Sequence, residues 1–318
     1  MIDAISRRRH HDHPDLGNAV VAIVGPTAVG KTALSLALGH AIGAEVVNAD
    51  SMQLYRGMDI GTAKLSPAEW EGVPHHVFDL WDVTEPASVA EYQRAARAAI
   101  DGVHARGRTP LLVGGSGLYV RAALEHFEFP GTDAQLRATL EAELAAAGPA
   151  ALHARLAGRD PAAAARILPS NGRRIVRALE VLELTGAPFA AGLPEPRPYY
   201  HCLYIGVDLD TTSLDERVAM RVDRMWAAGL IDEVRALERR GLRQGRTAGR
   251  ALGYQQVLRH LAGDCSEVQA KADTIQATRR FVRRQRSWFR RDPRVIWLDG
   301  QDPDLAVRAL ALAADARR

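Results

Sequence analysis

The sequence is poor in cysteine and lysine and has no long apolar run. Only Cys202 and Cys265 occur, without the paired Cys or His spacing of a zinc site, so a disulfide framework and a structural zinc site are both unsupported. No stretch of 18 apolar residues is uninterrupted, which argues against a membrane-spanning helix. The polar start lacks the apolar stretch of a secretory signal, so a cytoplasmic protein without membrane contact is expected.

The composition is that of a folded protein with an uneven charge. Hydrophobic residues make up 47% of the 318 residues and charged residues 25%, which excludes disorder as the dominant state and favours about two domains. Residues 239–291 hold 13 Arg and one Lys against three acids, a net charge of +11, so the rest of the chain carries −8. Because few acids within this stretch balance it, we expect a polyanionic partner.

Short apolar runs alternate with helical patterns along most of the chain. Buried strands are expected at 19–24, 45–50, 109–117, 200–208 and 294–300, with a weaker edge strand near 75–81. This alternation predicts an α/β fold, a parallel sheet flanked by helices. Residues 131–198 lack strand patterns and are expected to form an inserted all-helical subdomain, so the core domain would comprise 19–130 and 199–318. Residues 1–18 are expected to be a disordered extension.

A phosphate-binding loop is the most specific local motif. The string GPTAVGKT fits G-x-x-x-x-G-K-[ST] between an expected strand and helix, which makes the fold P-loop NTPase-like. Backbone N–H groups and the helix N-terminus would bind phosphate oxygens, Lys31 would reach a terminal phosphate, and the Thr32 hydroxyl would bind Mg²⁺. The loop consists of Gly25, Pro26, Thr27, Ala28, Val29, Gly30, Lys31 and Thr32.

One acid ends an expected strand beside this loop. Asp50 would lie at the carboxyl edge of the sheet, where ligands bind. It is compatible with a Mg²⁺ ligand or a helix cap, and also with a general base for an incoming nucleophile. The strand at 109–117 runs into Ser116 and carries no carboxylate, unlike the corresponding strand in the usual NTPases of this class.

Several strings are more specific than the loop. GPTAVGKT, NADSMQLYRGMDIGTAK, LLVGGSGLY, RRIVRALEV and RALGYQQV follow in this order between about residues 20 and 299, with RRQRSWFRR near the end. Together they resemble the tRNA dimethylallyltransferase family. The resemblance implies transfer of a dimethylallyl group from dimethylallyl diphosphate to N6 of adenine 37 in tRNA. The loop would then hold the departing diphosphate, stabilised by Lys31, Mg²⁺ and an Arg.

The resemblance also implies roles for individual residues. Asp50 would take the proton of the N6 amine, Arg221 would bind the diphosphate, and Ser116 stands where the family commonly has Thr. With Lys31, these form the expected catalytic set. Contacts with the tRNA anticodon stem-loop are implied for Asp50, Ser51, Met52, Gln53, Ser116, Arg137, Arg173, Arg174, Arg177, Arg250, Gly253, Tyr254, Arg283, Arg284, Arg286, Trp288 and Arg290.

Three alternatives stay open at this point. Trp288 and Phe289 either stack on unpaired bases or face the core of an amphipathic helix. A P-loop kinase would explain the loop and Asp50, but it would leave the basic stretch unused and would need a nucleoside triphosphate. A non-catalytic RNA-binding module would need neither Asp50 nor Ser116 beside the loop. The expected protein is a monomeric transferase with Mg²⁺ as its cofactor.

Overall fold

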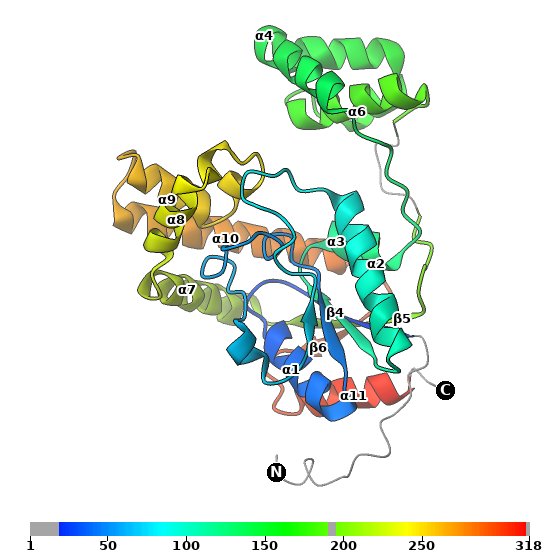
Figure 1. Ribbon diagram of the computed structural model, residues 1–318, viewed down its shortest axis with the longest axis vertical. Helices are drawn as coiled ribbons and strands as arrows, with labels where there is room; N and C mark the ends of the chain where they lie inside the picture. Colours follow the sequence, from blue (N-terminus) through cyan, green and yellow to red (C-terminus); the bar gives the residue numbers. More distant parts are fainter. Residues whose placement is uncertain (1–18, 190–194, 316–318) are drawn as a thin grey trace. The chain divides into compact units, whose positions relative to one another are not determined.

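The computed structural model describes residues 19–189 and 195–315, and these divide into two compact units (Figure 1). One unit combines the described residues up to Glu125 with those from Pro198 onward, and the other is His126–Arg197. The extension expected at residues 1–18 lies outside the described residues. No helix in the described ranges is long and apolar enough to cross a bilayer.

The first unit contains a six-stranded sheet in which every pairing is parallel. In spatial order the strands are β3 (His75–His76), β2 (Glu45–Asn48), β4 (Pro110–Gly114), β1 (Val20–Val24), β5 (Cys202–Asp208) and β6 (Val295–Asp299). The expected strands are confirmed, although the edge strand near 75–81 shortens to two residues. Because the strands are parallel, the segments that follow them leave from one edge of the sheet.

Helices flank the sheet because its strands are apolar on both faces. Val21 and Ile23, which point to the same side of β1, share a core with α1 (Lys31–Ile42) and α11 (Leu305–Asp315). Helices α2 (Val89–Ala105) and α3 (Gly117–Leu124) pack against one another and contact β4. The predicted fold class, a parallel sheet flanked by helices with a helical insertion, is confirmed.

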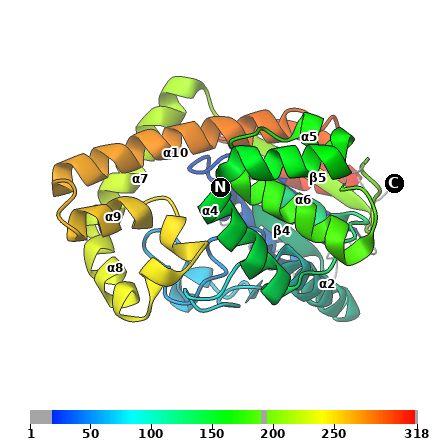
Figure 2. The ribbon, with the colours of Figure 1, turned by 90° about the horizontal axis from the view of Figure 1, so that it is seen from above.

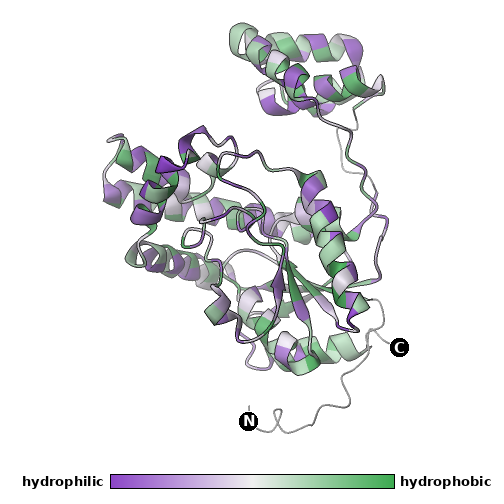
Figure 3. Ribbon diagram, viewed as in Figure 1, coloured by the Kyte–Doolittle hydropathy of each residue, from purple (hydrophilic) through white to green (hydrophobic). Residues whose placement is uncertain are grey.

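A cluster of helices adjoins the carboxyl edge of the sheet. It comprises α7 (Thr211–Ala227), α8 (Leu230–Arg239), α9 (Tyr254–Leu261) and α10 (Glu267–Phe289). The long helix α10 packs against α7 and α9 (Figure 2), and it also contacts α3. The helices are banded with hydrophobic and hydrophilic residues (Figure 3), as expected for helices that bury one side. Helix α10, which is part of the basic stretch 239–291, therefore reaches α3, the helix that follows strand β4.

The second unit has a hydrophobic core of its own. Its helices are α4 (Ala134–Arg159), α5 (Pro161–Arg166) and α6 (Gly172–Thr185), and apolar side chains of all three pack together. Helix α4 is interrupted at Gly148, where φ is +78°, and Pro149 follows. The break is expected because proline lacks the N–H group that a helix interior requires.

Candidate active site

The loop Gly25–Thr32 turns between β1 and α1 and exposes backbone N–H groups. A Cβ atom on Gly25 would lie 2.2 Å from the carbonyl oxygen of Val207 on β5, so only glycine fits there. Gly30 has a φ of +101° and turns the chain into the helix. Within the described ranges, the N–H groups of residues 28–32 have no acceptor. Converging free N–H groups at a helix N-terminus form an anion-binding site.

Lys31 lies against this loop. Its Nζ donates hydrogen bonds to the carbonyl oxygens of Gly25 (3.0 Å) and Pro26 (2.7 Å). Burial lowers the pKa of Lys31 to about 8, while the charge of Asp50 raises it and that of Arg221 lowers it. The three side chains are therefore close enough to influence one another's charge, so Lys31, Asp50 and Arg221 belong to one site.

We expect the affinity for inorganic pyrophosphate to fall as the pH rises through about 8. Because the pKa of Lys31 is lowered to about 8, its positive charge is present below this pH and is lost above it. Calorimetric titrations at a series of pH values measure the effect. The variant Lys31→Arg should bind with little pH dependence in this range, since a guanidinium does not lose its proton. An equally steep fall in that variant would assign the pH dependence to another group.

Asp50 and Ser116 follow β2 and β4, which are neighbours in the sheet. The backbone N–H of Ser51 donates a hydrogen bond to the Oγ of Ser116 at 3.3 Å, and the Oγ atoms of Ser51 and Ser116 are 3.2 Å apart. Oδ1 of Asp50 accepts the N–H of Met52 at 3.0 Å, whereas no donor in the described part of the chain bonds to Oδ2. Asp50 thus caps a turn and not a helix, so the helix-cap alternative is wrong. Its Oδ2 is left without a donor among the described residues.

Arg221 extends from α7 into the same region. It donates a hydrogen bond to the carbonyl oxygen of Thr62 (2.8 Å), and it forms no ion pair with any described carboxylate. Burial lowers the pKa of Arg221, and the charge of Asp50 opposes this shift. An enclosed guanidinium without an acid partner is costly to a folded protein, so its presence indicates a site for an anion.

Thr27, Asp50 and Arg221 line one cavity of about 320 Å³ in the first unit, whereas Lys31 and Ser116 are not part of its wall. Among the expected site residues, its wall includes Thr27, Asp50, Ser51, Met52, Arg221, Arg250, Gly253, Tyr254 and Arg284. Another part of the wall is apolar, with Val222, Met225 and Phe281. A cavity with cations beside an apolar wall suits a small ligand that is part phosphate and part hydrocarbon.

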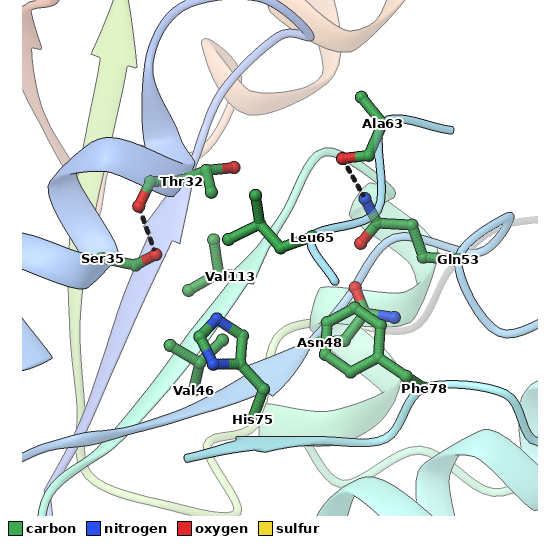
Figure 4. A pocket seen from close by; sticks show the side chains of 10 residues that line it. All are labelled: Thr32, Ser35, Val46, Asn48, Gln53, Ala63, Leu65, His75, Phe78 and Val113. Carbon is green, nitrogen blue, oxygen red and sulfur yellow. Dashed lines mark hydrogen bonds between the residues drawn. The ribbon is translucent and has the colours of Figure 1, made fainter. Parts of the chain in front are cut away.

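A second pocket of about 30 Å³ lies between α1 and the strands β2, β3 and β4 (Figure 4). It has room for water but not for a substrate. Gln53, at its wall, donates hydrogen bonds to the carbonyl oxygens of Thr62 (3.3 Å) and Ala63 (3.4 Å). The expected RNA contact Gln53 therefore also holds the loop whose Thr62 carbonyl accepts from Arg221.

Glu233 on α8, which sequence reasoning missed, fixes this loop from the other side. Its Oε2 accepts the N–H groups of Asp59 (3.0 Å) and Ile60 (2.7 Å), and its Oε1 accepts the Gly61 N–H (3.1 Å) and the Tyr254 hydroxyl (2.6 Å). Tyr254 is fully buried, and burial together with the Glu233 charge raises its pKa. The string MDIGTAK marked the loop as specific, but no local pattern joins it to Glu233.

We expect Glu233→Gln to lower the free energy of unfolding by about 2–3 kcal/mol, because the amide leaves N–H donors of the loop without an acceptor. Tyr254→Phe, which removes one of the four hydrogen bonds, should cost about 1 kcal/mol. Urea unfolding followed by circular dichroism measures both values. If Glu233→Gln were as stable as the parent protein, the carboxylate would not be what holds the loop.

Acidic residues from other parts of the chain neutralise some of the positive charge of the basic stretch 239–291. Asp208 at the end of β5 pairs with Arg286 and Arg290, both at 2.9 Å, and Asp215 on α7 pairs with Arg283 at 3.0 Å. The acids that balance these side chains thus come from outside the stretch. Arg250 and Arg284 line the cavity instead, and neither is ion-paired among the described residues.

The two aromatic residues near the end of α10 differ in environment. Phe289 is buried, as the core interpretation predicted. Trp288 is 38% exposed, but its indole Nε1 lies so close to Gly117 that a Cβ atom there would be 1.9 Å away. Trp288 therefore packs on the start of α3 and keeps a partly exposed ring.

Of the arginines in the second unit that are expected to contact RNA, two are paired with a buried acid and two are exposed. Arg137 and Arg177 both pair with Glu180, which is fully buried. Burial would raise the pKa of Glu180, but the hydrogen bonds from the two guanidinium groups lower it overall. Arg173 and Arg174 lie on the exposed side of α6. Arg137 and Arg177 thus have a structural role, and their contact with RNA stays a prediction.

A phosphate loop with free N–H groups, next to a partly apolar cavity lined by an arginine and an aspartate, is typical of a P-loop enzyme. The IPP transferase family matches residues 53–292, and the chain belongs to this family. It is 71% identical to the tRNA dimethylallyltransferase of Salinispora arenicola over 94% of this chain and 87% of that protein. It is 64% identical to that of Thermobifida fusca over 94% and 95% of the two chains.

Solved structures agree with this assignment. The full-length tRNA isopentenylpyrophosphate transferase from Bacillus halodurans is 41% identical, with a TM-score of 0.69 over 93% of this chain and 94% of that one. A eukaryotic dimethylallyltransferase acting on tRNA is 25% identical, with a TM-score of 0.81 over 93% and 79% of the two chains. The resemblance indicated by the motifs is confirmed, and so is the predicted enzyme class, a tRNA dimethylallyltransferase.

Proposed function

We propose that the enzyme transfers the dimethylallyl group of dimethylallyl diphosphate to N6 of adenine 37 in the anticodon stem-loop of tRNA, in the cytoplasm. The observation that carries this proposal is the cavity. Its wall carries the positive charges of Arg221, Arg250 and Arg284, and it also has apolar side chains at Val222, Met225 and Phe281. Thr27 brings the phosphate loop to the same wall. A diphosphate attached to a small hydrocarbon matches both parts.

Loss of the leaving group would be assisted by the cationic part of the cavity. When the C1–O bond of the donor breaks, both electrons go to the diphosphate oxygen. Preorganised N–H groups of residues 28–32, with Lys31 and Arg221, would stabilise the negative charge that develops there. Since the protein dipoles are already oriented, little rearrangement is needed as the charge forms.

Mg²⁺ is the proposed cofactor, and Thr32 fits one of its ligands. The Thr32 hydroxyl lies exposed at the start of α1 and has no hydrogen-bond partner among the described residues. Those residues also contain no cluster of three His, Cys, Asp or Glu that would hold a metal alone. Mg²⁺ commonly keeps water and phosphate oxygens as ligands, so Thr32 would share it with the diphosphate. Bound there, Mg²⁺ would supply additional neutralising charge.

The N6 amine of adenine would provide the electron pair for the new N–C1 bond. It is a weak nucleophile because its lone pair is delocalised into the ring, so correct positioning contributes more than proton removal. The proton released from N6 would pass to Oδ2 of Asp50. The base must leave its stack to reach the cavity, and Arg250 and Arg284 at the wall suit the RNA phosphates around it. We propose that the enzyme acts as a monomer.

The direct test incubates the protein with tRNA, Mg²⁺ and isotope-labelled dimethylallyl diphosphate, followed by nucleoside mass analysis. We expect adenosine to gain one C5H8 unit. A tRNA with guanosine at position 37 is the matched control and should stay unmodified. Transfer of phosphate from ATP would favour a kinase, and RNA binding without product would favour a non-catalytic module.

A further inference from the structure

One side of α10 faces the proposed site with more than its basic residues. Phe281 and Arg284 line the cavity, Gln285 bonds to the phosphate loop, and Trp288 packs on Gly117 at the start of α3. Side chains spaced by three, four and seven residues lie on the same side of a helix. The buried amide of Gln285 thus links α10 with the phosphate loop.

Gln285 makes two hydrogen bonds to backbone groups far away in the sequence. Its Oε1 accepts the N–H of Thr27 at 3.0 Å, and its Nε2 donates to the carbonyl oxygen of Gly115 at 2.9 Å. The side chain is 5% exposed, and a Cβ atom on Gly115 would lie 2.2 Å from Nε2. The amide orientation follows from its partners, because one of them is only a donor and the other only an acceptor.

We propose that Gln285 is a positioning residue for the transfer reaction, which holds the phosphate loop at a fixed distance from the turn that carries Ser116. The inference rests on the proposed function. Because the Thr27 N–H donates to Gln285, the diphosphate is left with the free N–H groups of residues 28–32. Because Gly115 precedes Ser116, and Ser116 bonds to Ser51, the same amide places the loop relative to Asp50.

This role predicts that changes at Gln285 affect the binding of the prenyl diphosphate and not the binding of tRNA. A side chain without hydrogen-bonding groups would leave a buried N–H and a buried C=O unpaired, so the loop and the turn would be free to shift. A shift of the loop would weaken diphosphate binding and misalign C1 with the attacking N6 amine beside Asp50. Binding of tRNA to the outer residues of α10 does not need the amide and should change little.

The test compares Gln285→Met, Gln285→Glu and a control, Gln276→Met, which makes the same exchange at an exposed residue of α10. Calorimetry without tRNA measures pyrophosphate affinity, and steady-state kinetics measure kcat and the KM of each substrate. For Gln285→Met we expect about tenfold weaker pyrophosphate binding and at least about tenfold lower kcat. The KM for tRNA should stay within about twofold of the parent value.

Gln285→Glu separates the two hydrogen bonds. The carboxylate still accepts from Thr27, but it cannot donate to Gly115, and its charge opposes the diphosphate. It should therefore bind pyrophosphate more weakly than Gln285→Met does, and it also serves as the test variant if Gln285→Met does not fold. The control Gln276→Met should match the parent protein in every measurement.

The outcomes distinguish this inference from the proposed function. If both Gln285 variants bind pyrophosphate and turn over like the control, Gln285 has no positioning role. If they lose thermal stability while both KM values and kcat are unchanged, its role is structural only, and the inference is overturned as well. If the parent protein transfers no prenyl group, the proposed function fails, and pyrophosphate binding still decides whether Gln285 sets the loop.

Discussion

Asp50→Asn should lower kcat by about 10²–10⁴-fold, the usual contribution of a general base. The amide oxygen of asparagine still accepts the Met52 N–H, so the turn after β2 is kept. The amide cannot take the proton of the N6 amine, which is what the free Oδ2 is proposed to do. Pyrophosphate affinity should stay near the parent value, since the loop N–H groups and Arg221 are unchanged.

Single-turnover rates with bound donor and saturating tRNA measure the effect on the chemical step. The experiment should be run below neutral pH, because loss of the Asp50 charge removes an influence that raises the pKa of Lys31, and the lysine must keep its charge in both proteins. Asp264→Asn, at an exposed residue without a side-chain hydrogen bond in the described part of the chain, is the matched control. A single-turnover rate equal to the parent rate in Asp50→Asn would remove the base assignment.

The phosphate loop was predictable from sequence because it encodes its own backbone path. Gly25 and Gly30 permit the turns, and Lys31 and Thr32 begin the helix, so all the needed information lies within eight residues. The same locality explains why the strands were predicted well. Each strand shows its burial in its own apolar run, whatever its neighbours in the sheet are.

Glu233 and Gln285 were not predictable, because their partners are distant. Glu233 bonds to a loop 172 residues away, and Gln285 bonds to Thr27, 258 residues away. A single Glu or Gln on an amphipathic helix gives no local signal of such a contact. Only the fold shows that the polar side of α10 turns inward at Gln285.

Charge clusters were informative about surface character but not about individual side chains. The net charge of +11 in residues 239–291 does not reveal that Asp208, which lies outside the stretch, holds Arg286 and Arg290. Similarly, RRIVR predicts a basic helix face, yet Arg177 in that string pairs with buried Glu180. The tertiary structure decides which arginines form ion pairs with acidic side chains and which are available to bind a ligand.

Arg221 is such an arginine, and Arg221→Gln should separate activity from stability. The guanidinium has one hydrogen bond, to Thr62, and no described acid neutralises it. Its removal should lower kcat/KM for the donor by about 10²–10³-fold, as for other groups that stabilise a developing anion. The free energy of unfolding should fall by no more than about 1 kcal/mol, because the lost hydrogen bond is offset by relief of an unpaired charge.

Steady-state kinetics with varied donor and urea unfolding of the same preparations measure the two effects. Arg239→Gln, at an exposed residue of α8 that does not line the cavity, removes the same charge elsewhere and should leave kcat/KM for the donor unchanged. A structural arginine would show the reverse pattern, a large loss of stability with activity reduced in proportion to the folded fraction. That result for Arg221→Gln would contradict the assignment of Arg221 to the diphosphate. Removal of a residue that serves binding is expected to weaken the reaction and to leave the stability of the fold unchanged.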